Sequence, residues 1–364
     1  MSTWVTVITS IISTSGRFHA IYSTFTTLIV LMPLIFLLAV ALGPVHIPVT
    51  EIFLSIADPN QERLLQTQLI ITHIRLPRAL LAAIIGALLG MSGAAMQGLF
   101  RNPLADPSLI GVTAGASAGA SLVIVLNSDF TTGIWGLSLI SLGAFCGGIA
   151  AVLLVYYLAN ITMNKSTQYT DSGVSVTTML LAGIGITALA GSITGIVELT
   201  ADNDMLRRIS LWRMGGLDGA NYARVVIVAV IAGAVFLLLP LHSTALNALL
   251  LGESEARHLG VDLKHLKYAL ILLVTIAVGT SVAMAGSIAF IGLVTPHIMR
   301  LLIGPNHRYL LPASALCGSI LLLLADTVAR TIIAPAELPT GIVTAIIGAP
   351  VFISLLRRYR YGYI

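Results

Sequence analysis

Runs of about 17 to 25 apolar residues recur along the whole chain of 364 residues, and they constrain its fold more than any other feature. A helix of that length crosses the roughly 30 Å hydrocarbon core of a bilayer. The chain is 57% hydrophobic and only 9% charged, which leaves too few charges to cover the surface of a soluble domain of this size. The short alternating segments typical of a membrane β-barrel are not found in the sequence. We therefore predict an all-α polytopic membrane protein.

Ten apolar segments are long enough to be membrane-spanning helices, and an even number of spans places both termini on one side of the membrane. We expect these helices to form one bundle between an N-terminal tail, residues 1–26, and a C-terminal tail, residues 359–364. The first twenty residues lack the positive n-region of a secretory signal. The predicted spans are 27–43, 79–98, 109–126, 135–158, 178–199, 225–241, 266–285, 288–303, 310–329 and 341–356.

The basic residues predict an orientation for the bundle. With both termini in the cytoplasm, eleven Lys and Arg residues fall inside and eight outside, a modest excess in the sense of the positive-inside rule. All three lysines fall inside, whereas every outer basic residue is an arginine, a side chain suited to bidentate pairing with carboxylates. The net charge of +4 reflects this topology, and we do not expect nucleic acid as a partner.

Glycines repeat four residues apart in several of the predicted spans. Small residues at this spacing let helix backbones approach closely, as lipid-embedded bundles require. We expect tight packing within one subunit at most of these positions, which are Gly86/Gly90, Gly111/Gly115/Gly119, Gly143/Gly147 and Gly191/Gly195.

The sequence lacks the motifs of several classes of function. No GxxxxGK[ST] loop is present to hold ATP phosphates, and neither HExxH nor GxSxG is present to serve a membrane hydrolase. An ion-coupled secondary transporter needs buried ionisable residues, for which Glu198 and Asp326 are the obvious candidates, both near predicted span ends. If the protein moves a solute uphill, we expect a partner to supply the energy.

The residues that could ligate a metal are scattered along the chain. Cys146 and Cys317 lie far apart inside apolar runs and are interpreted as packing residues. A single histidine in a span, His297, is more typical of a hydrogen bond between helices. Methionines commonly fill packing gaps, and we interpret Met91, Met96 and Met284 in this way. We predict no metal site and no stably bound cofactor.

The sequence LNALLLGESEARHLGVDLKHLK, residues 246–267, is densely charged for this chain. Glu253 and Glu255 precede Arg257 and His258, an order that complements the dipole of a helix, and Gly260 follows where a helix stop is expected. We therefore predict a short helix over residues 253–259. A solvated loop and a contact surface for a partner both agree with this pattern.

Four longer motifs resemble the permease subunits of FecCD-type ABC importers, which carry iron chelates, haem and cobalamin. They are IRLPRALLAAIIGALLGMSGAAMQGLFRNPLADPSLIGVTAGASAGA (74–120), GLVTPHIMRLLIGPNHRYLLP (292–312), LLLLADTVAR (321–330) and AELPTGIVTAIIGAPVFISLL (336–356). The resemblance covers residues 27 to 358. It implies ten transmembrane helices that pair as a homodimer around a central translocation path.

The resemblance also implies partners and a location. We expect a second copy of the chain, two cytoplasmic ABC ATPase subunits and a periplasmic substrate-binding protein, all at the inner membrane of a bacterial cell. ATP would then be hydrolysed on the ATPase subunits, so that the permease itself would not be an enzyme.

Two sets of residues match positions that contact these partners in the family. The charged segment 246–267 matches the coupling helices that sit in a groove of the ATPase, through Leu250, Gly252, Glu253, Glu255, Ala256, Arg257, Leu259 and Gly260. Three arginines match positions that receive acidic residues of the binding protein, and they are Arg75, Arg78 and Arg330. An intrahelical pair between Arg330 and Asp326 is the structural alternative.

The outer segment ADNDMLRRISLWRMGGLDGAN, residues 201–221, gives a hypothesis for the substrate. It presents four side chains as an entrance for an anionic substrate, or alternatively as interfacial anchors, and they are Arg207, Arg208, Trp212 and Arg213. The segment resembles the haem branch of the family, although Arg213 departs from the apolar residue expected there. We favour haem over a ferric siderophore or cobalamin.

Overall fold

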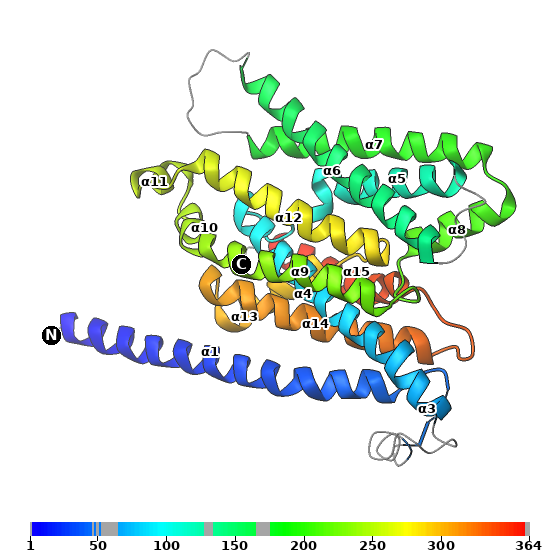
Figure 1. Ribbon diagram of the computed structural model, residues 1–364. Helices are drawn as coiled ribbons and strands as arrows, with labels where there is room; N and C mark the ends of the chain where they lie inside the picture. The colour runs from blue at the N-terminus through cyan, green and yellow to red at the C-terminus, as the bar shows by residue number, and fades with distance from the viewer. Residues whose placement is uncertain are drawn as a thin grey trace.

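The computed structural model describes residues 2–45, 47–48, 51, 65–126, 134–164 and 175–360. Every regular element within these residues is a helix. The helices run roughly parallel and antiparallel to one another in one bundle (Figure 1). The elements are α1 (Ser2–Ala41), α3 (Leu65–Leu69), the π-helix η2 (Ile70–Arg75), α4 (Leu76–Phe100), the 3₁₀ helix η3 (Pro107–Ile110), α5 (Val112–Leu126), α6 (Ile134–Asn164), α7 (Val176–Thr200), α8 (Asn203–Met214), α9 (Tyr222–Leu238), the 3₁₀ helix η4 (Leu239–His242), α10 (Ser243–Leu249), α11 (Glu253–His258), α12 (Leu263–Ala285), α13 (Ile291–Ile303), α14 (His307–Thr331) and α15 (Thr340–Arg360).

Each of the ten predicted spans coincides with a helix or with consecutive helices of the bundle. Seven helical segments in the described part of the chain are long and apolar enough to cross a membrane. The other three predicted spans fall on the shorter apolar helices α5, α13 and α15, so the count of ten crossings stays a prediction. The predicted boundary at residue 26 stays a prediction, and α1 is one continuous helix from Ser2 to Ala41.

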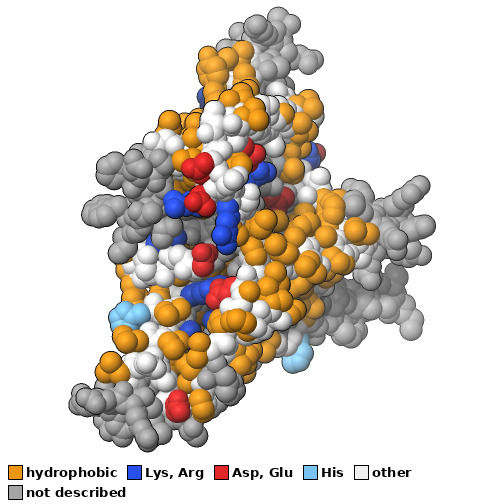
Figure 2. Space-filling model, turned by 90° about the vertical axis from the view of Figure 1, so that its right-hand side faces the viewer, with side chains coloured by type: hydrophobic (Ala, Val, Ile, Leu, Met, Phe, Trp, Pro, Cys, Tyr) orange, Lys and Arg blue, Asp and Glu red, His pale blue; other side chains and the backbone are white. Residues whose placement is uncertain are grey.

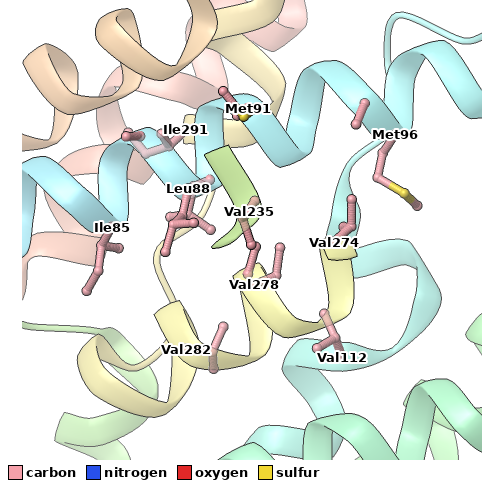
Figure 3. Packing of buried hydrophobic residues seen from close by; sticks show 14 of the residues in the cluster. Ile85, Leu88, Met91, Met96, Val112, Val235, Val274, Val278, Val282 and Ile291 are labelled. Carbon is pink, nitrogen blue, oxygen red and sulfur yellow. The ribbon is translucent and has the colours of Figure 1, made fainter. Parts of the chain in front are cut away.

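The centre of the bundle is α4, which is buried along almost its whole length. It packs most extensively against α14, and also against α9, α12 and α13. Figure 3 shows how apolar side chains from α4, α5, α9, α12 and α13 meet there; the residues labelled are Ile85, Leu88, Met91, Met96, Val112, Val235, Val274, Val278, Val282 and Ile291. The contacts of α4 therefore join α9, α12, α13 and α14 into one core.

The glycine prediction is confirmed for most of the repeats. A Cβ at Gly86 would lie 2.3 Å from the carbonyl oxygen of Gly318, and one at Gly119 would lie 2.1 Å from that of Gly143, so only glycine allows these helix pairs to meet. Gly191 and Gly195 differ, because a Cβ at either would meet nothing within 4 Å. Their face of α7 is not packed inside this chain, and tight packing within one subunit does not explain them.

Candidate functional site

The charged segment 246–267 lies at one end of the bundle, the end that also holds the start of α1 (Figure 1). It contains α10 and the short helix α11, which begins at Glu253 and ends at His258. The predicted stop is confirmed: Gly260 has a φ of 84°, and its N–H donates to the Arg257 carbonyl while the Val261 N–H donates to that of Ala256. This is the hydrogen-bond pattern of a Schellman motif.

Three contacts hold this segment against the bundle. The buried ammonium of Lys267 on α12 lies 3.1 Å from the Glu253 carboxylate, and the side chain of Ala256 is fully buried. The Asn247 side chain on α10 donates to the Asn306 side chain and accepts from the His307 backbone N–H, each at 2.8 Å. As a result α11 is attached to α12, and α10 is attached to the start of α14.

The outward face of the segment mixes charge with exposed apolar side chains. Glu255 and Arg257 face solvent, and Leu259 is 65% exposed. Among the leucines of the segment, Leu246 and Leu249 are in the core, whereas Leu250 and Leu259 are exposed. Gly252, with a φ of 123°, forms the turn between α10 and α11.

The start of α12 completes this end of the molecule. The Asp262 side chain caps the helix by accepting from the His265 backbone N–H at 3.0 Å. This hydrogen bond, together with the one from the His265 ring, holds the pKa of the Asp262 carboxyl below its usual range.

A buried ion cluster lies near the opposite end of the bundle, where α4, α14 and α15 meet. Asp326 is its centre: it pairs with Arg78 at 2.9 Å and with Arg330 at 3.0 Å, and it also accepts from the Thr340 hydroxyl. The remaining edge of the Arg78 guanidinium lies 2.7 Å from Glu337. Arg78, Arg330 and Asp326 are all buried, so the cluster ties the three helices together.

Arg75 and Arg330 also cap the C-terminus of α1. The last four carbonyls of an α-helix have no partner within the helix. Arg75 donates to the carbonyls of Val40 and Ala41, and Arg330 donates to that of Ala39. Two cations at the C-terminus of a helix also interact favourably with the negative end of the helix dipole.

This arrangement corrects one expectation for the three arginines predicted to dock a partner. A side chain that docks a partner has to be accessible, but Arg75 and Arg330 are each only 2% exposed, and their hydrogen bonds go to α1 and Asp326. The structural alternative, an Arg330–Asp326 pair within α14, is therefore present. Among the three, Arg78 alone lines the cavity described next.

A cavity of about 530 Å³ opens beside the ion cluster. Its wall includes Arg78 and Glu337, the α8 side chains Arg208 and Trp212, and Arg224 at the start of α9. Figure 2, which looks onto this end, shows basic and acidic side chains gathered in its middle with hydrophobic side chains around them. The floor of the cavity includes apolar residues of the core, which are Ile124, Ile140, Ala283 and Ala285.

Glycines shape one side of this cavity. Gly215 has a φ of 72° and Gly286 a φ of 65°, a backbone region that favours glycine. A Cβ at Gly286 would lie 2.2 Å from the Trp212 carbonyl oxygen. The end of α8 and the end of α12 can therefore touch through their backbones.

The predicted entrance residues divide between two faces of α8. Arg208 and Trp212 are four residues apart, and both line the cavity. Arg207 is exposed but is not part of the lining. Arg213 also points elsewhere, since it pairs with Glu198 on α7 at 3.0 Å. Glu198, one of the two carboxylates considered for ion coupling, is therefore partnered outside the core.

Sequence reasoning missed three charged residues that line the cavity, which are Asp218, Arg224 and Glu337. Glu337 lies within one of the motifs that carry the family resemblance, and a carboxylate beside an outer arginine would have been a usable signal. Arg224 was counted only as an outer basic residue. Its guanidinium donates to the Met284 carbonyl at 3.3 Å, a contact with distant backbone that no local pattern indicates.

Comparison with known proteins places almost the whole chain in one family of transporters. Residues 29–358 match the FecCD transport family. The chain is 42% identical to the hemin transport system permease protein HmuU of Yersinia pestis over 79% of this chain and 83% of that one. It is 39% identical to the cobalamin import system permease protein BtuC of Halobacterium salinarum over 85% and 80% of the two chains.

A solved structure agrees with these relatives. It is described as a metal-chelate type ABC transporter in an inward-facing conformation, and it superposes with a TM-score of 0.78 at 31% identity. The match covers 92% of this chain and 98% of the other. The chain therefore belongs to the FecCD transport family, and it is a multi-pass membrane permease of the ABC-importer type.

Proposed function

We propose that this chain is the permease of an ABC importer that carries haem across the bacterial inner membrane. It would act as a homodimer with two cytoplasmic ATPase subunits and a periplasmic substrate-binding protein, and both of its termini would be cytoplasmic. The observation that carries this proposal is the match to the FecCD family over residues 29–358. The different side chains at the two ends of the bundle support two different partners, one on each side.

The end that contains α10 and α11 is the proposed contact for the ATPase. The exposed side chains of Leu259 and Leu251 give this end an apolar surface, and Glu255 and Arg257 add charge beside it. Because α11 is attached to α12 and α10 to α14, a displacement of this surface would move two long helices of the core. Both helices end near the cavity, which supports a role in alternating access.

The opposite end is the proposed contact for the binding protein. Arg78 is the docking residue that the geometry supports, because it is the only one of the three matching arginines that lines the cavity. Arg75 and Arg330 would act indirectly, by holding α1 and Asp326 around it.

Haem is the favoured cargo because the Yersinia relative at 42% identity is named for hemin transport. An outer surface with Arg207, Arg208 and Trp212 suits a substrate that has carboxylates on a flat apolar ring. Cobalamin and ferric siderophores are the alternatives within the family, and the relative from Halobacterium salinarum is named for cobalamin.

The test is uptake by the full complex, reconstituted in vesicles with its ATPase and binding protein. We expect ATP-dependent accumulation of hemin, measured by haem absorbance inside the vesicles. Accumulation of cobalamin or a ferric siderophore without hemin would change the cargo and leave the permease assignment intact. Uptake that continues without ATP and stops with an uncoupler would instead identify an ion-coupled secondary transporter.

A single substitution tests the ATPase contact. Leu259→Asp places a charge on the exposed face of the coupling segment without touching the core, so the permease should insert normally but should lose the ATPase during copurification. Ile332→Asp is the matched control, because Ile332 is 63% exposed, follows the end of α14 at the other end of the bundle and lies outside the predicted spans. Equal recovery of the ATPase with both variants would contradict the assignment.

A further inference from the structure

The two edges of the Arg78 guanidinium have unequal partners. The Nε and Nη2 edge pairs with Asp326, whose side chain is 2% exposed. The Nη1 atom pairs with Glu337, whose side chain is 34% exposed and belongs to the segment between α14 and α15. One guanidinium therefore joins an internal carboxylate to a carboxylate at the surface.

The two pairs differ in how easily they separate. A buried ion pair that loses one partner leaves an uncompensated charge, whereas a partly exposed carboxylate regains water when it leaves. The Leu338 N–H donates to the Ala329 carbonyl at 2.9 Å, so the backbone is anchored next to Glu337. Rotation of the Glu337 side chain is enough to open its pair, and the Arg78–Asp326 pair stays closed.

The cavity indicates what would replace Glu337. Three arginines, Arg78, Arg208 and Arg224, line it against two carboxylates, Asp218 and Glu337. When the Glu337 side chain swings out, one carboxylate remains against three arginines, and the cavity favours another anion. The apolar floor at Ala283 and Ala285 belongs to the core, so the cavity suits a group that enters from outside and leaves the same way.

We propose that Glu337 is an internal competitor that occupies the Arg78 edge until a carboxylate of the docked substrate-binding protein replaces it. This proposal rests on the proposed function, since the partner is the binding protein named there. The occupant is an aspartate or glutamate side chain of that protein. Glu337 itself shows that a carboxylate fits at this edge of Arg78.

Competition of this kind has a kinetic signature. If the Glu337 pair is closed most of the time, only the open fraction of the permease can bind. The apparent association constant is then the intrinsic association constant multiplied by that open fraction. A partly exposed pair worth up to 1 kcal/mol corresponds to a factor of about five. Glu337→Gln should therefore raise the affinity about two- to fivefold through a faster association rate, with little change in the dissociation rate.

The experiment uses the permease–ATPase complex in lipid nanodiscs and the hemin-loaded binding protein of the same import system as the probe. Association and dissociation rates are measured for the wild type, Glu337→Gln and Glu337→Ala. Asp204→Asn is the matched control, because it removes one exposed carboxylate at the same end without touching the cavity. We expect faster association for both Glu337 variants and an unchanged rate for the control.

Each outcome has a separate meaning. Equal association rates for the wild type and the Glu337 variants, or weaker binding of the variants, would overturn the competition, and weaker binding would make Glu337 a contact for the partner. A wild-type complex that binds no substrate-binding protein at all would instead contradict the proposed function.

Discussion

Asp326 accepts hydrogen bonds from two arginines and a threonine while only 1% of its surface is exposed. Its two oxygens neutralise Arg78 and Arg330, and the Thr340 hydroxyl joins the start of α15 to the same group. Without the carboxylate, two buried guanidinium groups would lose their main counter-charge. The geometry of this end of the bundle therefore depends on one side chain.

Asp326→Asn tests this dependence. The substitution keeps the shape of the side chain but removes its charge, and loss of one partner from a buried ion pair typically lowers the free energy of unfolding by about 3 to 5 kcal/mol. Glu198→Gln is the control, because the Glu198–Arg213 pair is largely exposed and should be worth less than about 1 kcal/mol. The measurement is thermal unfolding of the purified permease, and equal losses in the two variants would contradict the central role of Asp326.

The sequence predicted contacts that depend on neighbours in the chain, and it failed for contacts that depend on distant backbone. Gly260 could be predicted as a helix stop because the acids, bases and glycine that define α11 lie within eight residues. The roles of Arg75 and Arg330 could not be predicted, because their acceptors are main-chain carbonyls of α1 that carry no sequence signal. The family resemblance assigned both arginines to a partner outside the chain, and for Arg330 the pair with Asp326 was the alternative that the spacing did indicate.

At the scale of helices, the sequence predicted which positions need glycine but not which helix each glycine would meet. Gly86 and Gly90 face α14, and Gly115 and Gly119 face α6. The same four-residue spacing at Gly191 and Gly195 leads to open space, because α7 lies at the margin of the chain and exposes most of its residues. Spacing alone does not distinguish a buried contact from an exposed face.

Gly93→Ala tests whether close approach of α4 and α13 is required. A Cβ at this position would lie 1.7 Å from the Gly292 carbonyl oxygen, so the two helices would have to separate, at a cost of about 1 to 3 kcal/mol in the free energy of unfolding. Gly233→Ala on α9 is the control, since its Cβ meets nothing within 4 Å and alanine favours a helix by about 1 kcal/mol. A lower melting temperature for Gly93→Ala, with none for Gly233→Ala, is the expected result.

At the scale of the whole molecule, the two candidate contact surfaces are connected by continuous helices. α14 begins at the Asn247 contact beside α10 and reaches the ion cluster at Asp326 and Arg330. α12 begins at Leu263, its Lys267 pairs with Glu253 of α11, and its last residues line the cavity. A change of tilt in either helix would therefore reach both surfaces, which is the coupling that an importer with partners on opposite sides requires.

The orientation of these surfaces, and the number of crossings, can be tested together. Besides the six-residue α11, the helices between Leu251 and Ile332 are α12, α13 and α14. Because α12 and α14 are each long and apolar enough to cross, the two residues are on opposite sides of the membrane only if α13 crosses as well. α13 has 13 residues and is about 20 Å long, less than the bilayer core. It is surrounded by α4, α14 and α15, however, and a helix enclosed by protein does not have to match the thickness of the lipid.

We predict that α13 crosses and that the surface formed by α10 and α11 is cytoplasmic. Leu251→Cys and Ile332→Cys are suitable reporters, because the Leu251 and Ile332 side chains are each more than 60% exposed. Each is made separately in a chain whose own cysteines are removed by Cys146→Ser and Cys317→Ser. A membrane-impermeant maleimide should label the Ile332→Cys variant in intact spheroplasts and the Leu251→Cys variant only after lysis. The opposite order would invert the orientation of the bundle. Labelling of both variants in intact spheroplasts would mean that an even number of helices crosses between them, and the ten-span topology would then be wrong.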